Sequence, residues 1–268
     1  MRMLASMKDM SKVFTNPRTG KGLVALNDVT LEVEEGEFLC LLGPSGCGKS
    51  TTLNLLAGFE FPTVGEVSFK GAPIRSPSPE RGVVFQESSL FPWMTVLQNV
   101  TFSLRGAQDR KERESMALRY LELVGLADFA QARPNELSGG MKQRVAIART
   151  LAMDPDLLLM DEPFGSLDEQ TRRKLDNEVL DLWKKEGKTV VFVTHSIEEA
   201  LILGTRVVVM SASPGRICKE WKIDLPWPRD PSSPEMGRLK EEMAQGLQVC
   251  SCARNAPRTS FVRIEGGD

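Results

Sequence analysis

The stretch that decides the fold is Gly43-Pro44-Ser45-Gly46-Cys47-Gly48-Lys49-Ser50. It follows a continuous apolar run over 38–42, which is typical of a buried strand, and it opens a helix that we expect over 49–57 and that Gly58 can end. In this strand-to-helix context, glycines let backbone N–H groups wrap phosphate oxygens, and the helix N-terminus adds its partial positive charge. The sequence therefore predicts a nucleotide phosphate loop rather than a merely glycine-rich turn.

Three side chains of this segment have predicted roles in nucleotide binding. We expect Lys49 to reach the β- and γ-phosphates and Ser50 to offer its hydroxyl to Mg²⁺. Thr51 is placed for a further phosphate contact. A nucleoside triphosphate and Mg²⁺ are therefore the expected ligands.

A second apolar run, Leu157 to Met160, ends in two carboxylates, Asp161 and Glu162. By itself this pattern is equally compatible with a solvated strand end. Beside a phosphate loop, however, Asp161 can hold the magnesium shell and Glu162 can polarise an attacking water as general base.

The rest of the chain indicates an α/β protein. Period-2 alternation over 29–34 and 66–69 predicts half-buried, antiparallel sheet, whereas the apolar runs at 190–193 and 207–210 predict buried parallel strands like those at 38–42 and 157–160. Between them a helical region spans about 90–152, in which Met116, Tyr120, Leu123 and Val124 recur at helical spacing. We therefore expect a P-loop NTPase fold with an antiparallel β subdomain and a helical subdomain.

Composition limits the partners and the compartment. Lysine and arginine number 34 against 36 aspartate and glutamate, so the net charge of −2 gives no electrostatic footprint for nucleic acid. No apolar run approaches the ~18 residues of a spanning helix, and the first 12 residues do not resemble a secretory signal. The odd number of cysteines, 5, favours a reducing, cytosolic compartment.

Two further positions carry a functional and a plain structural interpretation. His195, the only histidine, ends the 190–194 strand, and Ser196 with Glu199 matches a capping box for the next helix. A lone histidine is commonly structural, but the carboxyl edge of parallel strands is where α/β proteins bind ligands. Ser138 precedes Gly139 and Gly140 at the start of another expected helix. This helix start is interpreted either as a plain N-cap or as a second site that binds an anion.

With these motifs in place, the sequence resembles the ATP-binding subunits of ABC transporters over about residues 5–225. The resemblance identifies 137–144 with the family signature, Gln86 with the Q-loop glutamine and His195 with the switch histidine. It implies a D-loop at Ser166-Leu167-Asp168, and it assigns Gln86 to the magnesium and catalytic site. Phe14 is the implied adenine-stacking aromatic, with a packed core phenylalanine as the alternative.

The resemblance also implies partners. In the family two ATP-binding subunits dimerise head to tail, so Ser138, Gly139 and Gly140 would bind the γ-phosphate of ATP held by the other chain. Met141, where glutamine is common, and the stretch 91–100 resemble the branch that imports nitrate, sulfonates and taurine. The implied partners are integral-membrane permease subunits and a separate solute-binding protein, and the implied location is the cytoplasmic face of the inner membrane. The prolines at 226, 228, 231 and 234 interrupt any regular pattern, so we expect residues 226–268 to be an extension of the 1–225 domain without a recognisable strand. These residues are too few for a regulatory domain.

Two other classes of ATPase compete with this interpretation. Soluble ABC-type ATPases that act on DNA or ribosomes carry two motif sets or a long coiled-coil insertion, whereas this chain has one set, with Asp161 only 112 residues after Lys49. A P-loop small-molecule kinase has no use for a signature motif.

The cysteines give a separate expectation about reactivity. Cys47, inside the phosphate loop, is expected to react with maleimide and to be protected by MgATP. It can at the same time be a small filler side chain, because tolerance of other residues there does not prevent reactivity. Cys40 is expected to react slowly, and Cys250 and Cys252 fast.

Overall fold

The computed structural model describes residues 2–104, 109–165, 169–212 and 214–252. The chain divides into two compact units, Met1–Pro77 with Val191–Asp268, and Ser78–Val190. The helical region expected at about 90–152 lies inside the second unit. The C-terminal extension belongs to the first unit.

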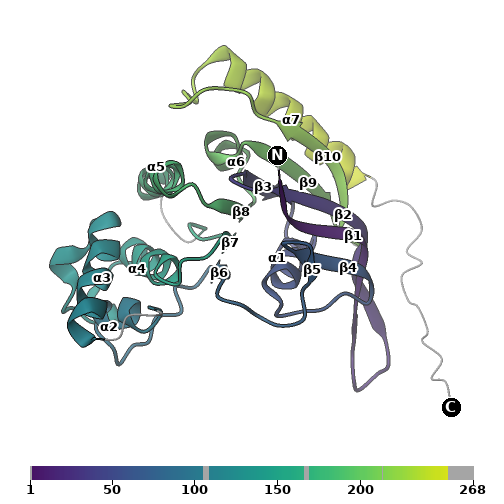
Figure 1. Ribbon diagram of the computed structural model, residues 1–268. Helices are drawn as coiled ribbons and strands as arrows, with labels where there is room; N and C mark the ends of the chain where they lie inside the picture. Colours follow the sequence, from purple (N-terminus) through teal and green to yellow (C-terminus); the bar gives the residue numbers. More distant parts are fainter. Residues whose placement is uncertain (1, 105–108, 166–168, 213, 253–268) are drawn as a thin grey trace. The chain divides into compact units, whose positions relative to one another are not determined.

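The first unit contains a four-stranded sheet in the order β2-β1-β4-β5 (Figure 1). Its strands are β1 (Met3–Thr15), β2 (Gly22–Glu34), β4 (Val64–Phe69) and β5 (Ala72–Pro73). All pairings are antiparallel. In β2, Val29, Leu31 and Val33 are buried and the residues between them are exposed, so the alternation predicted from the sequence is confirmed.

The same unit holds the strands that position the phosphate loop. They are β3 (Phe38–Leu42), β8 (Thr189–Thr194), which carries the chain over from the second unit, β9 (Arg206–Ser211) and β10 (Arg216–Lys222), in the order β10-β9-β3-β8. The β3–β9 pairing is parallel, as predicted, and the β9–β10 pairing is antiparallel. Every residue of β3 and β8 is buried. Continuous apolar runs therefore mark the strands buried on both faces.

Three α-helices complete the first unit: α1 (Lys49–Ala57), α6 (Ile197–Leu203) and α7 (Pro234–Cys252). The predicted helix over 49–57 is confirmed, with Gly58 as its left-handed C-cap. Helix α7 packs against β9, β10 and α6 (Figure 1). The extension after residue 225 therefore contributes an ordered helix to this unit.

The second unit consists of a strand pair and a set of helices. Strand β6 (Arg81–Val84) pairs in parallel with β7 (Leu157–Asp161). The helices are α2 (Val96–Thr101), α3 (Arg110–Leu123), α4 (Gly139–Leu151) and α5 (Glu169–Glu186), with short 3₁₀ turns at Ala127–Phe129 and Pro134–Glu136.

The apolar face of α3 differs from the predicted one by one residue. The fully buried side chains of this helix are Ala117 and Leu121, whereas Met116 and Tyr120 are only partly buried against the same core. The prediction relied on the large side chains of Met116 and Tyr120. In the structure the small Ala117 lies in the core of the second unit, and Met116 and Tyr120 pack at the edge of that core.

Among the described residues, the structure has no helix that combines the length and the apolar character needed to cross a membrane.

Candidate functional site

The phosphate loop lies between β3 and α1. Lys49 is buried and donates from Nζ to the carbonyl oxygens of Gly43, at 2.8 Å, and Pro44, at 3.2 Å. Ser45, Gly46 and Ser50 are exposed. The loop thus holds its lysine folded over its own carbonyls, and its exposed residues face solvent.

Helix α1 starts without a side-chain cap. Its N-cap, Gly48, has φ 92°, and no cap hydrogen bond is formed by a side chain in the described part of the chain. A Cβ atom at Gly48 would collide with Leu26 Cδ2, so glycine is required by both backbone conformation and space. Uncapped first-turn N–H groups together with the helix dipole favour an anion at this end.

Cys47 has the properties of a filler side chain. It is 0% exposed, and its Sγ lies 3.9 Å from Lys49 Nζ. Cys40 is buried as predicted. Cys250 is buried too, which argues against the fast reaction expected of it. A buried thiol is shielded from reagents, which favours the filler interpretation of Cys47.

His195 directly follows β8 and its side chain is exposed, whereas the adjoining turn is held by buried groups. Thr194 Oγ1 donates to Glu199 Oε2 and accepts a hydrogen bond from the Ser196 amide at 2.9 Å. Ser196 caps α6 by accepting from the Glu199 amide at 3.3 Å. Of the two hydrogen bonds in the predicted capping box, the one from the Glu199 amide to Ser196 is present. The other is wrong, because the Glu199 carboxylate accepts from Thr194 instead of from the Ser196 amide. Nothing in the sequence indicates the Thr194–Glu199 hydrogen bond, because the spacing of Glu199 from Ser196 is typical of a capping box.

In the second unit, Asp161 is the last residue of β7 and Glu162 follows with φ 42°, a left-handed conformation that is uncommon for residues with a Cβ. A Cβ atom at Gly165 would lie 3.6 Å from Glu162 Oε2 and 3.7 Å from Gln86 Nε2. The predicted base and the predicted Q-loop glutamine therefore flank one small space next to Gly165.

The signature segment caps α4. Ser138 Oγ accepts a hydrogen bond from the Met141 amide at 3.3 Å, so the plain N-cap geometry is present. Ser138 and Gly139 are exposed and Gly140 is buried. The exposed end of α4 is thereby available to a ligand or partner.

Two side chains of α4 connect this helix to the segment around Gln86: Gln143, which belongs to the signature segment, and Arg149, which the sequence did not single out. Buried Gln143 donates from Nε2 to the Phe85 carbonyl at 2.9 Å. Arg149 donates to the carbonyls of Ser89, at 2.8 Å, and Ser88, at 3.3 Å. Burial lowers the pKa of Arg149. The sequence marks Gln143 through the signature motif, whereas the signal for Arg149 is only a charged residue on a largely apolar helix.

Phe91, Trp93 and Phe102 form an aromatic cluster just beyond this segment. Phe91 lies 5.5 Å from Trp93 and 4.9 Å from Phe102 between ring centroids, yet Trp93 is 67% exposed and Phe102 61%. Buried Asn99 holds the loop by accepting from the Phe91 amide, at 2.8 Å, and by donating to the Phe91 carbonyl, at 3.2 Å. The surface is apolar and its backbone is fixed.

Phe14 lies near the end of β1, with Lys12 Nζ 4.8 Å from its ring centroid. At 36% exposed it is not a packed core phenylalanine, so that alternative is wrong. The predicted D-loop residues, Ser166, Leu167 and Asp168, lie outside the described residues.

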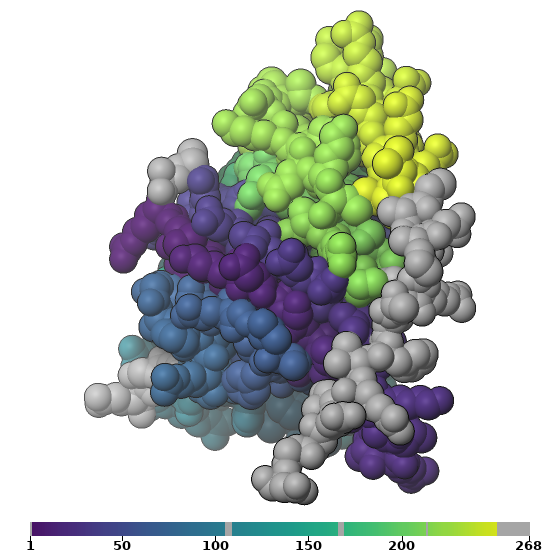
Figure 2. Space-filling view, turned by 90° about the vertical axis from the view of Figure 1, so that its right-hand side faces the viewer, coloured from purple at the N-terminus to yellow at the C-terminus, as the bar shows by residue number. Residues whose placement is uncertain are grey.

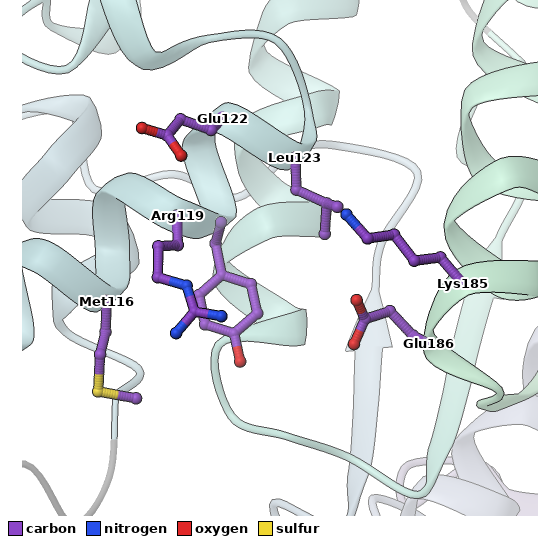
Figure 3. A pocket seen from close by; sticks show the side chains of 7 residues that line it. Met116, Arg119, Glu122, Leu123, Lys185 and Glu186 are labelled. Carbon is purple, nitrogen blue, oxygen red and sulfur yellow. The ribbon is translucent and has the colours of Figure 1, made fainter.

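The second unit contains a pocket of about 390 Å³ (Figure 3). Residues of α3 and the end of α5 line it: Met116, Arg119, Tyr120, Glu122, Leu123, Lys185 and Glu186. Burial, and then the carboxylates of Asp154 and Glu186, raise the pKa of Tyr120. The pocket is lined by both signs of charge and contains none of the predicted site residues.

The predicted residues thus fall into two sets. The phosphate loop, Phe14 and His195 belong to the first unit, and Gln86, Asp161, Glu162 and the signature residues belong to the second. Within the second unit, the structure brings Glu162 and Gln86 together beside Gly165.

Comparisons with known proteins identify the family. The family model for ABC transporters matches residues 26–165. The taurine import ATP-binding protein TauB of Roseobacter denitrificans is 48% identical over 247 residues, which cover 89% of this chain and 91% of the relative. The nitrate import ATP-binding protein NrtD of Synechocystis sp. is 45% identical over 241 residues, which cover 90% of each.

Solved structures agree with the sequence relatives. The dimeric structure of a bacterial ABC transporter cassette superposes with a TM-score of 0.73 at 37% identity, covering 83% of this chain and 100% of that chain. A dimeric structure of a post-hydrolysis state bound to ADP and Pi gives 0.72 at 35% identity. The chain is therefore an ABC ATPase and belongs to the family of ABC transporter ATP-binding proteins.

Proposed function

We propose that this chain is the ATP-hydrolysing subunit of a membrane importer for nitrate, taurine or an aliphatic sulfonate. The observation that carries the proposal is the identity of 45–48% to nitrate and taurine import ATP-binding proteins over about nine-tenths of the chain. Met141 and the stretch 91–100 support the same branch.

The phosphate loop, residues 43–51, binds the phosphates of ATP in this proposal, and the exposed Phe14 stacks on adenine. The exposed Ser50 hydroxyl, the Gln86 amide and the half-buried Asp161 carboxylate are the oxygen donors that would hold Mg²⁺. This donor set fits a hard cation that prefers oxygen ligands. When bound, Mg²⁺ neutralises charge on the phosphates.

Glu162 acts as general base toward the attacking water, and Gln86 and His195 complete the catalytic group. The proximity of Glu162 and Gln86 beside Gly165 supports this assignment. The left-handed backbone of Glu162 supports it as well, because such conformations concentrate at functional sites.

The active assembly in this proposal is a homodimer. Ser138, Gly139, Gly140 and Asp168 of one chain act on ATP held by the phosphate loop of the other. The dimeric cassette to which this chain is similar supports the arrangement, and so does the exposed N-terminal end of α4.

The aromatic cluster of Phe91, Trp93 and Phe102 is the proposed contact for an integral-membrane permease subunit. Exposed aromatic side chains on a fixed backbone are typical of interaction sites. The chain then works as a peripheral protein on the cytoplasmic face of the membrane, and a separate binding protein delivers the solute.

The test is reconstitution of the chain with a candidate permease and solute-binding protein from the same organism, followed by ATPase assays with taurine, an alkanesulfonate and nitrate. We expect one of these solutes to stimulate hydrolysis, and Trp93→Ser to reduce recovery of the chain with the permease. Val249→Ser, at an exposed position in the first unit, is the control. Stimulation by none of the three would overturn the solute assignment, and hydrolysis without any permease association would favour the alternative, a soluble ABC-type ATPase not coupled to transport.

A further inference from the structure

Cys218 and Cys250 are brought together where α7 packs on β10. Cys218 is exposed in β10, and Cys250 is buried in α7. Their thiols interact although 32 positions separate them in the sequence, and this interaction contributes to the raised pKa of Cys250. Both belong to the first unit, in which the light-green β10 and the yellow α7 lie next to one another (Figure 2).

Packing of Trp221 against α7 fixes this juxtaposition. Trp221 is buried, and a Cβ atom at Gly246 would lie 2.6 Å from its Cη2, so the helix approaches the strand closely at that point. Cys250 follows Gly246 by four residues, about one turn, and therefore faces the same side as Gly246. The close contact one turn away holds the Cys250 side chain over β10.

A β-bulge turns Cys218 toward the same helix. Ile217 pairs with Met210 and Lys219 with Val209, so Cys218 is the extra residue of the bulge. Lys219 lies with Trp221 on the helix side, its Nζ 4.6 Å from the Trp221 ring. Because a bulge breaks strict alternation, Cys218 reaches this side as well, next to Lys219.

The two thiols differ in environment as the partners in a redox pair do. Burial, and then the Cys218 hydrogen bond, raise the pKa of Cys250 to about 12, against a smaller opposing effect of Lys219. Cys250 is therefore a protonated thiol at neutral pH. Cys218 is the exposed member, which a reagent from solvent meets first.

We propose that Cys218 and Cys250 are a redox pair that a small-molecule disulfide, such as oxidised glutathione, converts into an intramolecular disulfide tethering α7 to β10. The Cys218 thiolate attacks one sulfur of the glutathione disulfide, forms a mixed disulfide and releases one reduced glutathione. Cys250 then loses its proton and attacks the Cys218 sulfur, releasing the second. Two protein thiols are oxidised and one disulfide is reduced, so atoms and electrons balance.

A metal site explains the pair less well. Two thiolates supply half of the four ligands of a structural zinc site. Among the side chains the structure describes, no group of three or more metal-ligating residues is found. The disulfide is therefore the chemistry that two adjacent thiols support.

The effect of oxidation is a covalent hold on the C-terminal helix. Helix α7 contacts α6 and β9 as well as β10. A bond between Cys218 and Cys250 closes a loop and so lowers the conformational entropy of the unfolded chain. In the folded protein it prevents α7 from detaching from β10. We therefore expect the oxidised protein to have a higher melting temperature than the reduced protein.

The test treats the full-length, reduced chain with oxidised glutathione and analyses tryptic peptides without reduction. Cleavage releases Cys218 in peptide 217–219, and it releases Cys250 and Cys252 together in peptide 241–254. We expect these two peptides to be linked, in wild type and equally in Cys252→Ser. The link should be absent from Cys218→Ser and Cys250→Ser, and dithiothreitol should reverse both the link and the rise in melting temperature.

Other results would overturn the proposal. Loss of the link in Cys252→Ser would assign it to Cys252, and a glutathione adduct that persists on Cys218 would exclude the pair. A link that forms only in denaturant, or with a fall in melting temperature, would show that the native fold does not support it. Buried Cys40 and Cys47 are internal controls and should stay unmodified. These readouts need no ATP hydrolysis, so they stand apart from the proposed transport function.

Discussion

Gln143 Nε2 donates to the backbone carbonyl of Phe85 across 2.9 Å, and Phe85 immediately precedes Gln86. This bond joins α4, which begins at the signature motif, to the segment that carries the predicted Q-loop glutamine. Gln143 is 4% exposed, so the bond is shielded from water. The contact gives the signature helix a direct means of positioning Gln86.

Gln143→Leu should uncouple these two elements. The substitution keeps an apolar volume but leaves the Phe85 carbonyl without its donor, a loss of about 1–3 kcal/mol in the free energy of unfolding. We expect ATPase activity to fall with Gln86 mispositioned. Urea denaturation and steady-state ATPase assays measure the two effects. Gln131→Leu, the same change at an exposed position, should change neither.

Glu162→Gln should abolish hydrolysis and leave ATP binding intact. The amide keeps the shape of the side chain but cannot act as a base, and a general base contributes ~10²–10⁴-fold. The variant should therefore accumulate as an ATP-bound dimer on size-exclusion chromatography. Glu112→Gln, on the exposed part of α3, is the matched control. Turnover of Glu162→Gln near the wild-type rate would remove this residue from the role.

The strands and α1 were predictable because their signals are local. Period-2 alternation marks β2, an unbroken apolar run marks β3, and a glycine at each end sets the limits of α1. Such signals depend on neighbours in the chain and need no knowledge of tertiary contacts.

The helix α7 and the carboxylate of Glu199 were not predictable in the same way. The proline-rich stretch before α7 suggested irregular chain, but Met236, Met243 and Cys250 recur every seven residues and form its buried face. Glu199 has the correct spacing for a capping box, yet its carboxylate bonds to Thr194. These outcomes depend on tertiary packing, which supplies apolar surface to α7 and a better donor to Glu199.

Arg229 should be required for stability of the C-terminal extension. Its buried guanidinium donates to the carbonyls of Leu201, at 2.6 Å, and Gly204, at 2.7 Å, at the C-terminal end of α6. Further bonds reach the carbonyls of Ile223 and Leu225. A cation at this end of a helix is favoured by the dipole.

Arg229→Leu leaves several buried acceptors without donors, so we expect a loss of at least about 3 kcal/mol in the free energy of unfolding. Urea denaturation followed by tryptophan fluorescence measures it. Arg238→Leu, at an exposed position of α7, should cost less than about 0.5 kcal/mol. Equal stability of the two variants would show that the Arg229 bonds contribute little.

Ser138→Arg should remove turnover while the nucleotide affinity of the isolated chain stays nearly unchanged, because the lesion acts on ATP held by the partner. Lys49→Ala should instead weaken ATP binding in its own chain, where Nζ is buried in the phosphate loop. In a mixture, the heterodimer has one site lacking both elements and one intact site, so some activity should return although neither parent is active. Ser115→Arg, the same change at an exposed position of α3, should leave turnover and complementation unaffected. An active Ser138→Arg homodimer, or a Ser138→Arg chain that no longer binds ATP, would show that the serine does not act across the dimer.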